Sequence, residues 1–236
     1  MEPLKITLSS LIGVLAAFSM HAQQHFQNLN FEKANPVVDP GGNPYPYAVT
    51  AASALPSWTV YLGTIQQTDV LQNLFTLGQA SVDVLGPNYQ ESGGGYSTID
   101  GNYSVLLQAG NLPGSPALVG ASIAQTGLVP LGSQSLQFDA ITSPSFSVSF
   151  DGNNLSPVVL GEGPNGSTLY GADISAFAGQ NGTLEFTALF SDSGASNFEL
   201  DDIAFSSSAV PEPNSFALSA MGGLLFGARQ WFARRG

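Results

Sequence analysis

Between His25 and Ser208, apolar and polar residues alternate with a period of two, and this pattern favours β-strands throughout the stretch. Successive side chains of a strand point to opposite faces of its sheet, so alternation places one apolar face against a core. The segments that we predict to be strands are residues 27–31, 58–62, 81–85, 103–108, 122–125, 135–141, 145–150, 155–160, 182–190 and 198–205.

Loops rich in Pro, Gly, Asn and Ser separate these segments, above all residues 36–46 and 87–95. The sequence Asp151-Gly152-Asn153-Asn154 indicates a tight turn, with residues 155–160 as the returning strand. About eight to ten short antiparallel strands predict an all-β fold, an antiparallel β-sandwich of jelly-roll type over residues 23–208. Inside this domain we expect one helical turn at 173–177, with Asp173 as its N-cap, and a second at 67–71.

Four short motifs spread over the domain resemble those of galactose-binding-like jelly rolls, which include many carbohydrate-binding modules. They are Asn30-Phe31-Glu32, Trp58-Thr59-Val60, Asp173 to Gly179, and Leu200-Asp201-Asp202-Ile203.

The resemblance implies that the first and last strands are neighbours, and that Glu32 shares a structural Ca²⁺ with Asp201 or Asp202. Calcium takes six to eight oxygen ligands, some of them from backbone carbonyls. Because neighbouring side chains of a regular strand face opposite sides, we expect at most one of the two aspartates to point at such a site. The alternative is that one aspartate is solvent-exposed and the other caps a loop.

Residues 209–236 form a separate tail. Two prolines end the strand pattern, an apolar run of residues 216–228 follows, and the chain then becomes basic. Counted from Phe216 to Phe232, the apolar segment is as long as the ~17 residues that a membrane-spanning helix needs at minimum. The arginines at the end of the chain would stay on the cytoplasmic side. The residues that define the tail are Val210, Pro211, Glu212, Pro213, Arg229, Arg234 and Arg235.

This order of Pro-Glu-Pro, short apolar helix and basic end resembles the PEP-CTERM sorting tail of Gram-negative bacteria. The resemblance implies that an exosortase, a membrane protease, recognises and cleaves the chain there. The alternatives are an ordinary single-pass tail anchor or a hydrophobic helix of the globular domain.

Residues 1–22 are typical of a secretory signal peptide, with an apolar stretch of residues 6–18 and a cleavage position at Ala22. The alternative is an uncleaved membrane anchor. A signal helix at one end and a sorting helix at the other predict export to the cell envelope, the cell surface or the extracellular matrix. Anchoring in the inner membrane would be transient.

The charge of the domain excludes several functions. Lys33 is the only Lys or Arg in residues 23–213, against 16 acids, which gives a formal charge of −15. Nucleic-acid binding needs cationic side chains to displace counterions, and the domain lacks them. The chain has no cysteine, which removes disulfides, thiol catalysis and Cys-ligated metals.

Four tyrosines in loops are candidates for stacking against sugar rings, because loops on a rigid sandwich commonly carry binding residues. Tyr45 and Tyr47 lie in the Pro-rich loop, and Tyr89 and Tyr96 flank the glycine run at 93–95. The alternative is that these rings only cover the ends of the core.

Catalytic constellations are missing from the sequence. His25 is the single His left after signal removal, so neither a Ser-His-Asp arrangement nor a His-based zinc site is predicted. We therefore expect a non-catalytic protein that binds polysaccharide or matrix proteins. The alternatives are a purely structural acidic matrix protein and, more remotely, a glycosidase that uses a pair of carboxylates.

Overall fold

The computed structural model describes residues 25–38, 47–76, 78–87, 89, 97–142, 145–190 and 196–211. Helical structure in them is limited to α1 (Ala51–Ala54), η1 (Pro164–Gly166) and η2 (Ser175–Phe177). The strands are β1 (Ala48–Thr50), β2 (Thr59–Leu62), β3 (Ile65–Gln67), β4 (Asp69–Gln72), β5 (Ser81–Leu85), β6 (Ser104–Gln108), β7 (Gly110–Asn111), β8 (Leu118–Val119), β9 (Ala121–Leu128), β10 (Ser135–Thr142), β11 (Phe146–Phe150), β12 (Asn153–Asn154), β13 (Val158–Glu162), β14 (Thr168–Asp173), β15 (Asn181–Ala188) and β16 (Asn197–Ser206).

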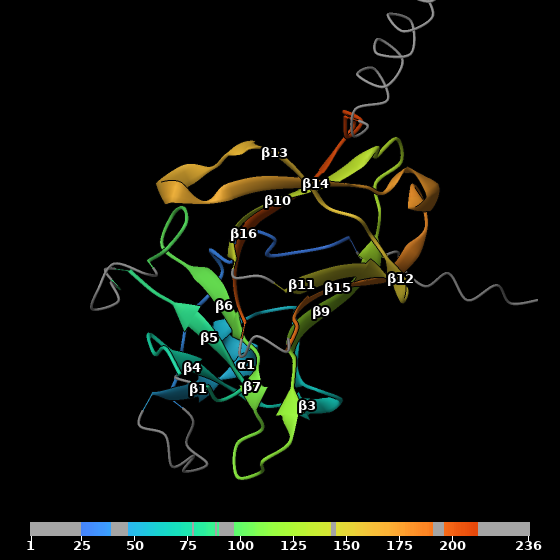
Figure 1. Cartoon of the computed structure of the whole chain (residues 1–236). Helices are drawn as coiled ribbons and strands as arrows, with labels where there is room; N and C mark the ends of the chain where they lie inside the picture. Colours follow the sequence, from blue (N-terminus) through green and yellow to red (C-terminus); the bar gives the residue numbers. More distant parts are fainter. Residues whose placement is uncertain are drawn as a thin grey trace, which may run out of the picture.

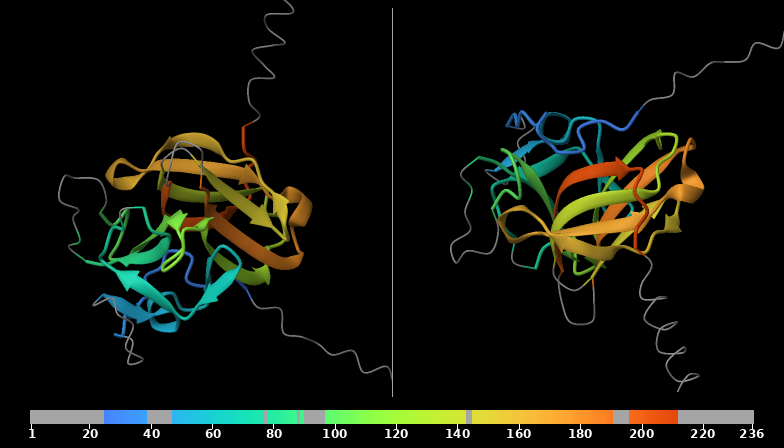
Figure 2. Two further views of the ribbon diagram at one scale, coloured as in Figure 1. Left: turned by 60° about the horizontal axis from the view of Figure 1, so that its bottom comes forward. Right: turned by 90° about the horizontal axis from the view of Figure 1, so that it is seen from above.

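The strands form two main sheets and a small hairpin (Figure 1). The larger sheet has the order β1-β4-β5-β6-β16-β10-β14-β13, and the smaller has the order β12-β11-β15-β9-β2-β3. The strands pair antiparallel in both sheets except for β4 and β5, which pair in parallel. Figure 2 shows the early strands, blue to teal, on one side of the molecule and the strands after residue 145, yellow to orange, on the other.

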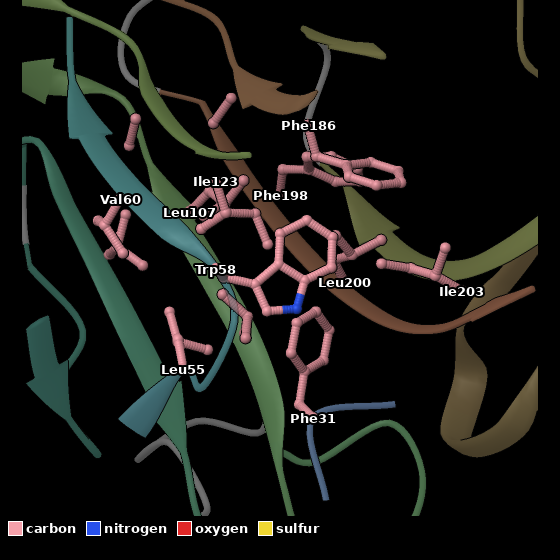
Figure 3. Close-up of a cluster of buried hydrophobic side chains, with 14 of the residues drawn as sticks. Phe31, Leu55, Trp58, Val60, Leu107, Ile123, Phe186, Phe198, Leu200 and Ile203 are labelled. Atoms are coloured by element: carbon pink, nitrogen blue, oxygen red, sulfur yellow. The ribbon is translucent and has the colours of Figure 1, made fainter. Parts of the chain in front are cut away.

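The core lies between the two sheets and is centred on Trp58, which immediately precedes β2 (Figure 3). Its indole packs against Phe31 and Phe186, with ring centroids 5.8 and 6.4 Å away. The indole N–H is satisfied by a hydrogen bond of 3.0 Å to the Asn28 carbonyl oxygen, as a buried Trp requires. The inward residues of the central strands, Phe198 and Leu200 among them, complete this cluster.

Most of the predicted strands are confirmed. Residues 81–85 are β5, and the stretches predicted near 58–62, 103–108, 122–125, 135–141, 145–150, 182–190 and 198–205 correspond to β2, β6, β9, β10, β11, β15 and β16. The period-two pattern succeeds here because one face of each strand packs on the core. Several elements were not predicted, namely β1, α1, β3, β4, β7, β8, η1 and β14.

The strand predicted at 27–31 is wrong. Asn28 and Phe31 have φ values of +51° and +54°, outside the region of regular strands, and the segment is a series of turns. The Asn28 side chain stabilises these turns, because its Oδ1 accepts a 2.9 Å hydrogen bond from the Lys33 N–H. Phe31 still reaches the core and is fully buried.

Two further predictions need correction. Residues 67–71 are not helical: Gln67 ends β3, residues 69–71 belong to β4, and Thr68 is a bend between them. Residues 155–160 do not form one returning strand. Instead β12 returns along β11 for two residues, and β13 then pairs with β14 in the larger sheet. The chain therefore crosses between sheets where the sequence predicted a simple hairpin.

The helical turn predicted at 173–177 is confirmed in part, as the 3₁₀ turn η2. Asp173 is the last residue of β14, and its Oδ1 accepts a 2.8 Å hydrogen bond from the Ser175 N–H. The predicted signal helix and sorting helix lie outside the described residues. Within the described part of the chain, no helix is both long and apolar enough to cross a membrane.

Candidate functional site

The carboxylate of Glu32 holds the turn that leads into β6. Its Oε1 accepts hydrogen bonds from the backbone N–H groups of Asn102 at 2.7 Å and Tyr103 at 2.9 Å. Its Oε2 accepts a third from Asn102 Nδ2 at 2.9 Å. Partial burial disfavours the charged form, but these three hydrogen bonds outweigh it and hold the pKa of Glu32 below its ordinary value. The turn can approach the Glu32 carboxylate this closely because residue 101 is glycine: a Cβ there would lie only 2.5 Å from Glu32 Oε1 and would clash with it.

The two candidate aspartates of the last strand lie at a β-bulge. The register of β16 against β10 shifts between the pairs Asp139–Asp201 and Gln137–Ala204, and Asp202 lies within this shift with φ +47°. A bulge interrupts the alternation of side chains along a strand. The expectation that Asp201 and Asp202 face opposite sides assumed a regular strand and does not apply here.

Asp201 is the buried member of this pair. Its Oδ1 accepts a hydrogen bond from the Asp202 N–H at 2.8 Å, and its Oδ2 accepts one from the Asp100 N–H at 3.2 Å. Burial raises the pKa of Asp201 to about 8, and the neighbouring charges of Asp202 and Glu32 act in the same direction. Burial, followed by the charges of Asp100, Asp139 and Glu32, also raises the pKa of Asp202.

Glu32 lies near the last strand, β16, since its charge acts on both Asp201 and Asp202. The prediction that the first and last strands are neighbours is wrong, because β16 pairs with β6 and β10 and β1 lies at the edge of the larger sheet. Among the residues that the structure describes, no three His, Cys, Asp or Glu side chains converge closely enough to hold a metal ion. Both oxygens of Glu32 and of Asp201 already accept hydrogen bonds from the chain. A calcium site is thus not preassembled here, and calcium stays a prediction.

Two other acids, Asp83 and Glu199, are fully buried, which the sequence pattern did not indicate. Asp83 of β5 and Glu199 of β16 both lie opposite Leu106 of β6, in one row across the larger sheet. Each makes one hydrogen bond: Asp83 Oδ1 accepts from the Leu74 N–H at 3.1 Å, and Glu199 Oε1 accepts from the Ser104 hydroxyl at 2.6 Å. The second oxygen of each carboxyl group, Asp83 Oδ2 and Glu199 Oε2, is buried and has no hydrogen-bond partner among the described residues.

Burial raises the pKa of Asp83 well above its ordinary value and that of Glu199 to about 8. The alternation of apolar and polar residues places these acids on the face of the sheet away from the core. From the sequence alone, that face is expected to be exposed to solvent. In the structure, loop segments cover that face: Thr76, for example, donates its N–H to the buried Gln108. We know of no sequence signal for such a cover, because it depends on contacts between distant residues.

Of the four candidate tyrosines, the structure describes Tyr47 and Tyr89, and Tyr45 and Tyr96 lie outside the described residues. Tyr47 is 53% exposed and lines a hollow of about 230 Å³ together with Val38, Gln72 and Asn73. This combination of an exposed ring and amide side chains is typical of surfaces that bind sugars.

Tyr89 is connected to Asn73, a residue that lines this hollow, by two hydrogen bonds through the backbone of Gly86. Asn73 Oδ1 accepts a 2.7 Å hydrogen bond from the Gly86 N–H, and the Gly86 carbonyl oxygen accepts one of 3.1 Å from the Tyr89 N–H. The turn that carries Tyr89 is therefore fixed to one wall of the Tyr47 hollow.

Hydrogen bonds hold the chain to the folded domain as far as Ser208, two residues before the predicted sorting motif. The Ser206 carbonyl oxygen accepts a hydrogen bond from the Gln134 N–H at 2.7 Å, and the Ser208 carbonyl oxygen accepts one from the Ser135 hydroxyl at 2.8 Å. Of the predicted tail residues, Val210 is partly buried and Pro211 is exposed. The other predicted tail residues, Glu212, Pro213, Arg229, Arg234 and Arg235, lie outside the described residues.

Comparison with known proteins adds little to this description. No protein-family model matches the chain, and no curated protein matches it. Among solved structures, a match is the apo form of a cyclase from Fischerella sp., with 12% sequence identity and a TM-score of 0.33. The match covers 77% of this chain and 93% of the cyclase chain.

The buried acids predict that the fold loses stability as the pH rises. Glu199 has a pKa of about 8 in the folded chain and an ordinary value of 4.5 when unfolded. Between these two pH values, folding takes up a proton, so the free energy of unfolding falls through this window and reaches its lowest level above about pH 8. Asp201 contributes in the same direction.

Urea unfolding at a series of pH values checks this prediction, with Glu199→Gln as the test variant. The amide oxygen can still accept the Ser104 hydrogen bond, so at pH 5 the variant should be about as stable as the wild type. At pH 9 the variant should be more stable by on the order of 2 kcal/mol. Parallel pH curves for the two proteins would contradict the burial of an ionisable group at position 199.

Proposed function

We propose that this chain is an exported, non-catalytic protein that an exosortase sorts to the cell envelope or exopolysaccharide matrix of a Gram-negative bacterium. There, we propose, it binds glycan or other matrix components. The sorting motif and the signal peptide support the first part of this proposal. We further propose that the domain is a galactose-binding-like jelly roll. The two mainly antiparallel sheets and the core centred on Trp58 support this proposal.

The observation that carries the binding proposal is the Tyr47 hollow. A sugar ring has one apolar face, which stacks on an aromatic ring, and equatorial hydroxyls that need hydrogen-bond partners. Tyr47 offers the ring, and Gln72 and Asn73 offer amide groups beside it. Val38, which is 71% exposed, extends the apolar surface. The acidic charge of the domain favours neutral sugars over anionic ones.

A structural role as an acidic matrix protein is the second candidate, and the charge of −15 favours it. Such a protein would hold cations and water through many exposed carboxylates, without one defined ligand. The two candidates differ in where binding occurs, at one hollow or over the whole surface.

Removing the aromatic ring should separate these candidates. We expect the full chain to bind a subset of neutral glycans on an array, and Tyr47→Ala to lower that affinity about tenfold or more, because a central aromatic contact is lost. Tyr61→Ala, on β2 of the other sheet, is the matched control and should bind normally. Equal binding by all three proteins, or no glycan binding, would remove the Tyr47 site from the proposal.

Processing of the tail is tested on the surface-exposed protein. Mass spectrometry should find a C-terminus near Pro213, with Arg229, Arg234 and Arg235 removed. Replacing both prolines of the motif, Pro211→Ala with Pro213→Ala, should leave the chain uncleaved, whereas Pro164→Ala in η1 should not. A mature surface form that still ends at Gly236 would contradict sorting by an exosortase.

The calcium prediction has a direct test. If Ca²⁺ binds near Glu32 and Asp201, EDTA should lower the melting temperature of the chain, and Glu32→Gln should abolish the difference. Glu162→Gln on the edge strand β13 removes one charge elsewhere and should leave the EDTA effect intact. A melting curve that EDTA does not change would exclude a stabilising calcium ion.

A further inference from the structure

The segment that follows β4, residues 73–76, contacts the buried carboxyl group of Asp83 on the neighbouring strand β5. The strands β4, β5 and β6 lie side by side in the larger sheet (Figure 1). The Leu74 N–H donates a 3.1 Å hydrogen bond to Asp83 Oδ1, and the other oxygen, Oδ2, is buried without a partner among the described residues. We call residues 73–76 the strap.

Neutral groups hold the strap at three further points. The Asn73 N–H donates to the Val84 carbonyl oxygen at 3.1 Å, and the Thr76 N–H donates to Gln108 Oε1 at 3.0 Å. The Thr76 hydroxyl donates to the Gln79 carbonyl oxygen at 2.8 Å. All four strap residues are partly exposed, so opening the strap costs less than unfolding a strand of the core.

The surroundings of Asp83 offer no charge that could balance its own. The residues opposite it on the neighbouring strands are Leu71 of β4 and Leu106 of β6, and the next ionisable group in the same row is another acid, Glu199 of β16. The strap carries no ionisable side chain. Burial therefore dominates and raises the pKa of Asp83, and only the hydrogen bond from Leu74 acts against it.

Ionisation of Asp83 disfavours the closed strap. Oδ1 has one donor, but Oδ2 would carry charge without a hydrogen bond from any described residue. A buried carboxylate in this state needs further donors, and the water on the exposed side of the strap can supply them once the strap opens. The neutral carboxylic acid stays enclosed at a lower cost, because its desolvation penalty is smaller.

The strap is also continuous with the Tyr47 hollow. Its first residue, Asn73, lines the hollow, and Asn73 Oδ1 accepts a 2.7 Å hydrogen bond from the Gly86 N–H. The preceding residue, Gln72, lines the hollow too and donates its N–H to the Tyr47 carbonyl oxygen at 2.9 Å. When the strap opens, Asn73 leaves the wall of the hollow and the Gly86 N–H loses its acceptor.

We propose that the strap is a pH-dependent switch, which is closed while Asp83 is neutral, opens when Asp83 is ionised and thereby takes the Tyr47 hollow apart. Its consequence for ligand binding rests on the proposed glycan site, whereas the opening itself does not. Closing takes up a proton, so it is fully favoured below the ordinary pKa of 3.8 and becomes weaker as the pH rises toward the higher pKa of the closed form.

Hydrogen–deuterium exchange tests the switch, read residue by residue by mass spectrometry on the full chain in detergent micelles. The reporters are the N–H groups of Leu74 and Thr76 in the strap and of Gly86 in the wall of the hollow. Protection is the exchange rate of an unstructured amide divided by the observed rate. From pH 5 to pH 9 we expect the protection of all three to fall by up to about tenfold per pH unit, because closing takes up one proton. It should stay below the protection of the β15 amides, which exchange through global unfolding.

Two variants of buried acids locate the effect. Asp83→Asn keeps an oxygen for the Leu74 N–H but cannot ionise, so the protection of the reporters should no longer depend on pH. Glu199→Gln removes the other buried acid of the row and should keep the pH dependence of the wild type. The proposal is overturned if wild-type protection at Leu74 does not change with pH, if Asp83→Asn keeps the change, or if Gly86 stays protected while the strap opens. The first and third outcomes need only the wild type, so they decide the matter even where the variant does not fold.

Glycan binding at the two pH values separates the switch from the proposed function. We expect wild-type binding on the array to be weaker at pH 9 than at pH 5, and binding by Asp83→Asn to be equal at both. If no glycan binds at either pH, the proposed function fails and the exchange data alone decide the switch. If glycan binds equally at both pH values although the strap opens, the link between the strap and the Tyr47 hollow is overturned.

Discussion

The structure depends on how carboxylates are accommodated in a domain with no cationic side chain after Lys33. An acid on an inner strand cannot form an ion pair with Lys or Arg there, so backbone N–H groups, hydroxyls or a proton must compensate its burial. Glu32 illustrates the first solution, since three hydrogen bonds keep it ionised. Asp83 and Glu199 tend toward the last, because burial raises the pKa of both and each has, among the described residues, one donor and one oxygen without a partner.

The lack of cationic partners for buried carboxylates matters most at β16, which carries the buried acids Glu199 and Asp201. The strand pairs with β6 and β10 in the middle of the larger sheet, so its side chains have neighbours on both sides. Phe198 and Leu200 point into the core, Glu199 and Asp201 are buried on the other face, and the strand ends four residues before the predicted sorting motif at 210–213. One strand thus connects the core with the acidic region.

The Tyr47 hollow and the buried acids are connected through β4. Gln72 ends this strand and lines the hollow, and the strap that follows it contacts Asp83 of β5. The hollow and the strap lie near the edge of the larger sheet, where β4 pairs in parallel with β5 for only two residues. Incomplete pairing leaves space between elements there, whereas the centre of the sandwich is filled by aromatic rings. A binding site at the edge of the sheet leaves the core intact.

By itself the sequence determined the strand-rich class of the domain, the positions of its longer strands, the absence of cations after Lys33 and the motif at 210–213. These properties follow from local patterns, because alternation and composition act over a few neighbouring residues. Only the tertiary structure decided that residues 27–31 form turns, that β16 bulges at Asp202, and that Asp83 and Glu199 are sealed. Each depends on segments far apart in the chain: Asn102 and Tyr103 meet Glu32 across about 70 positions, and Ser104 meets Glu199 across 95. A period-two pattern says which face of a strand is apolar, but not which loop will cover the polar one.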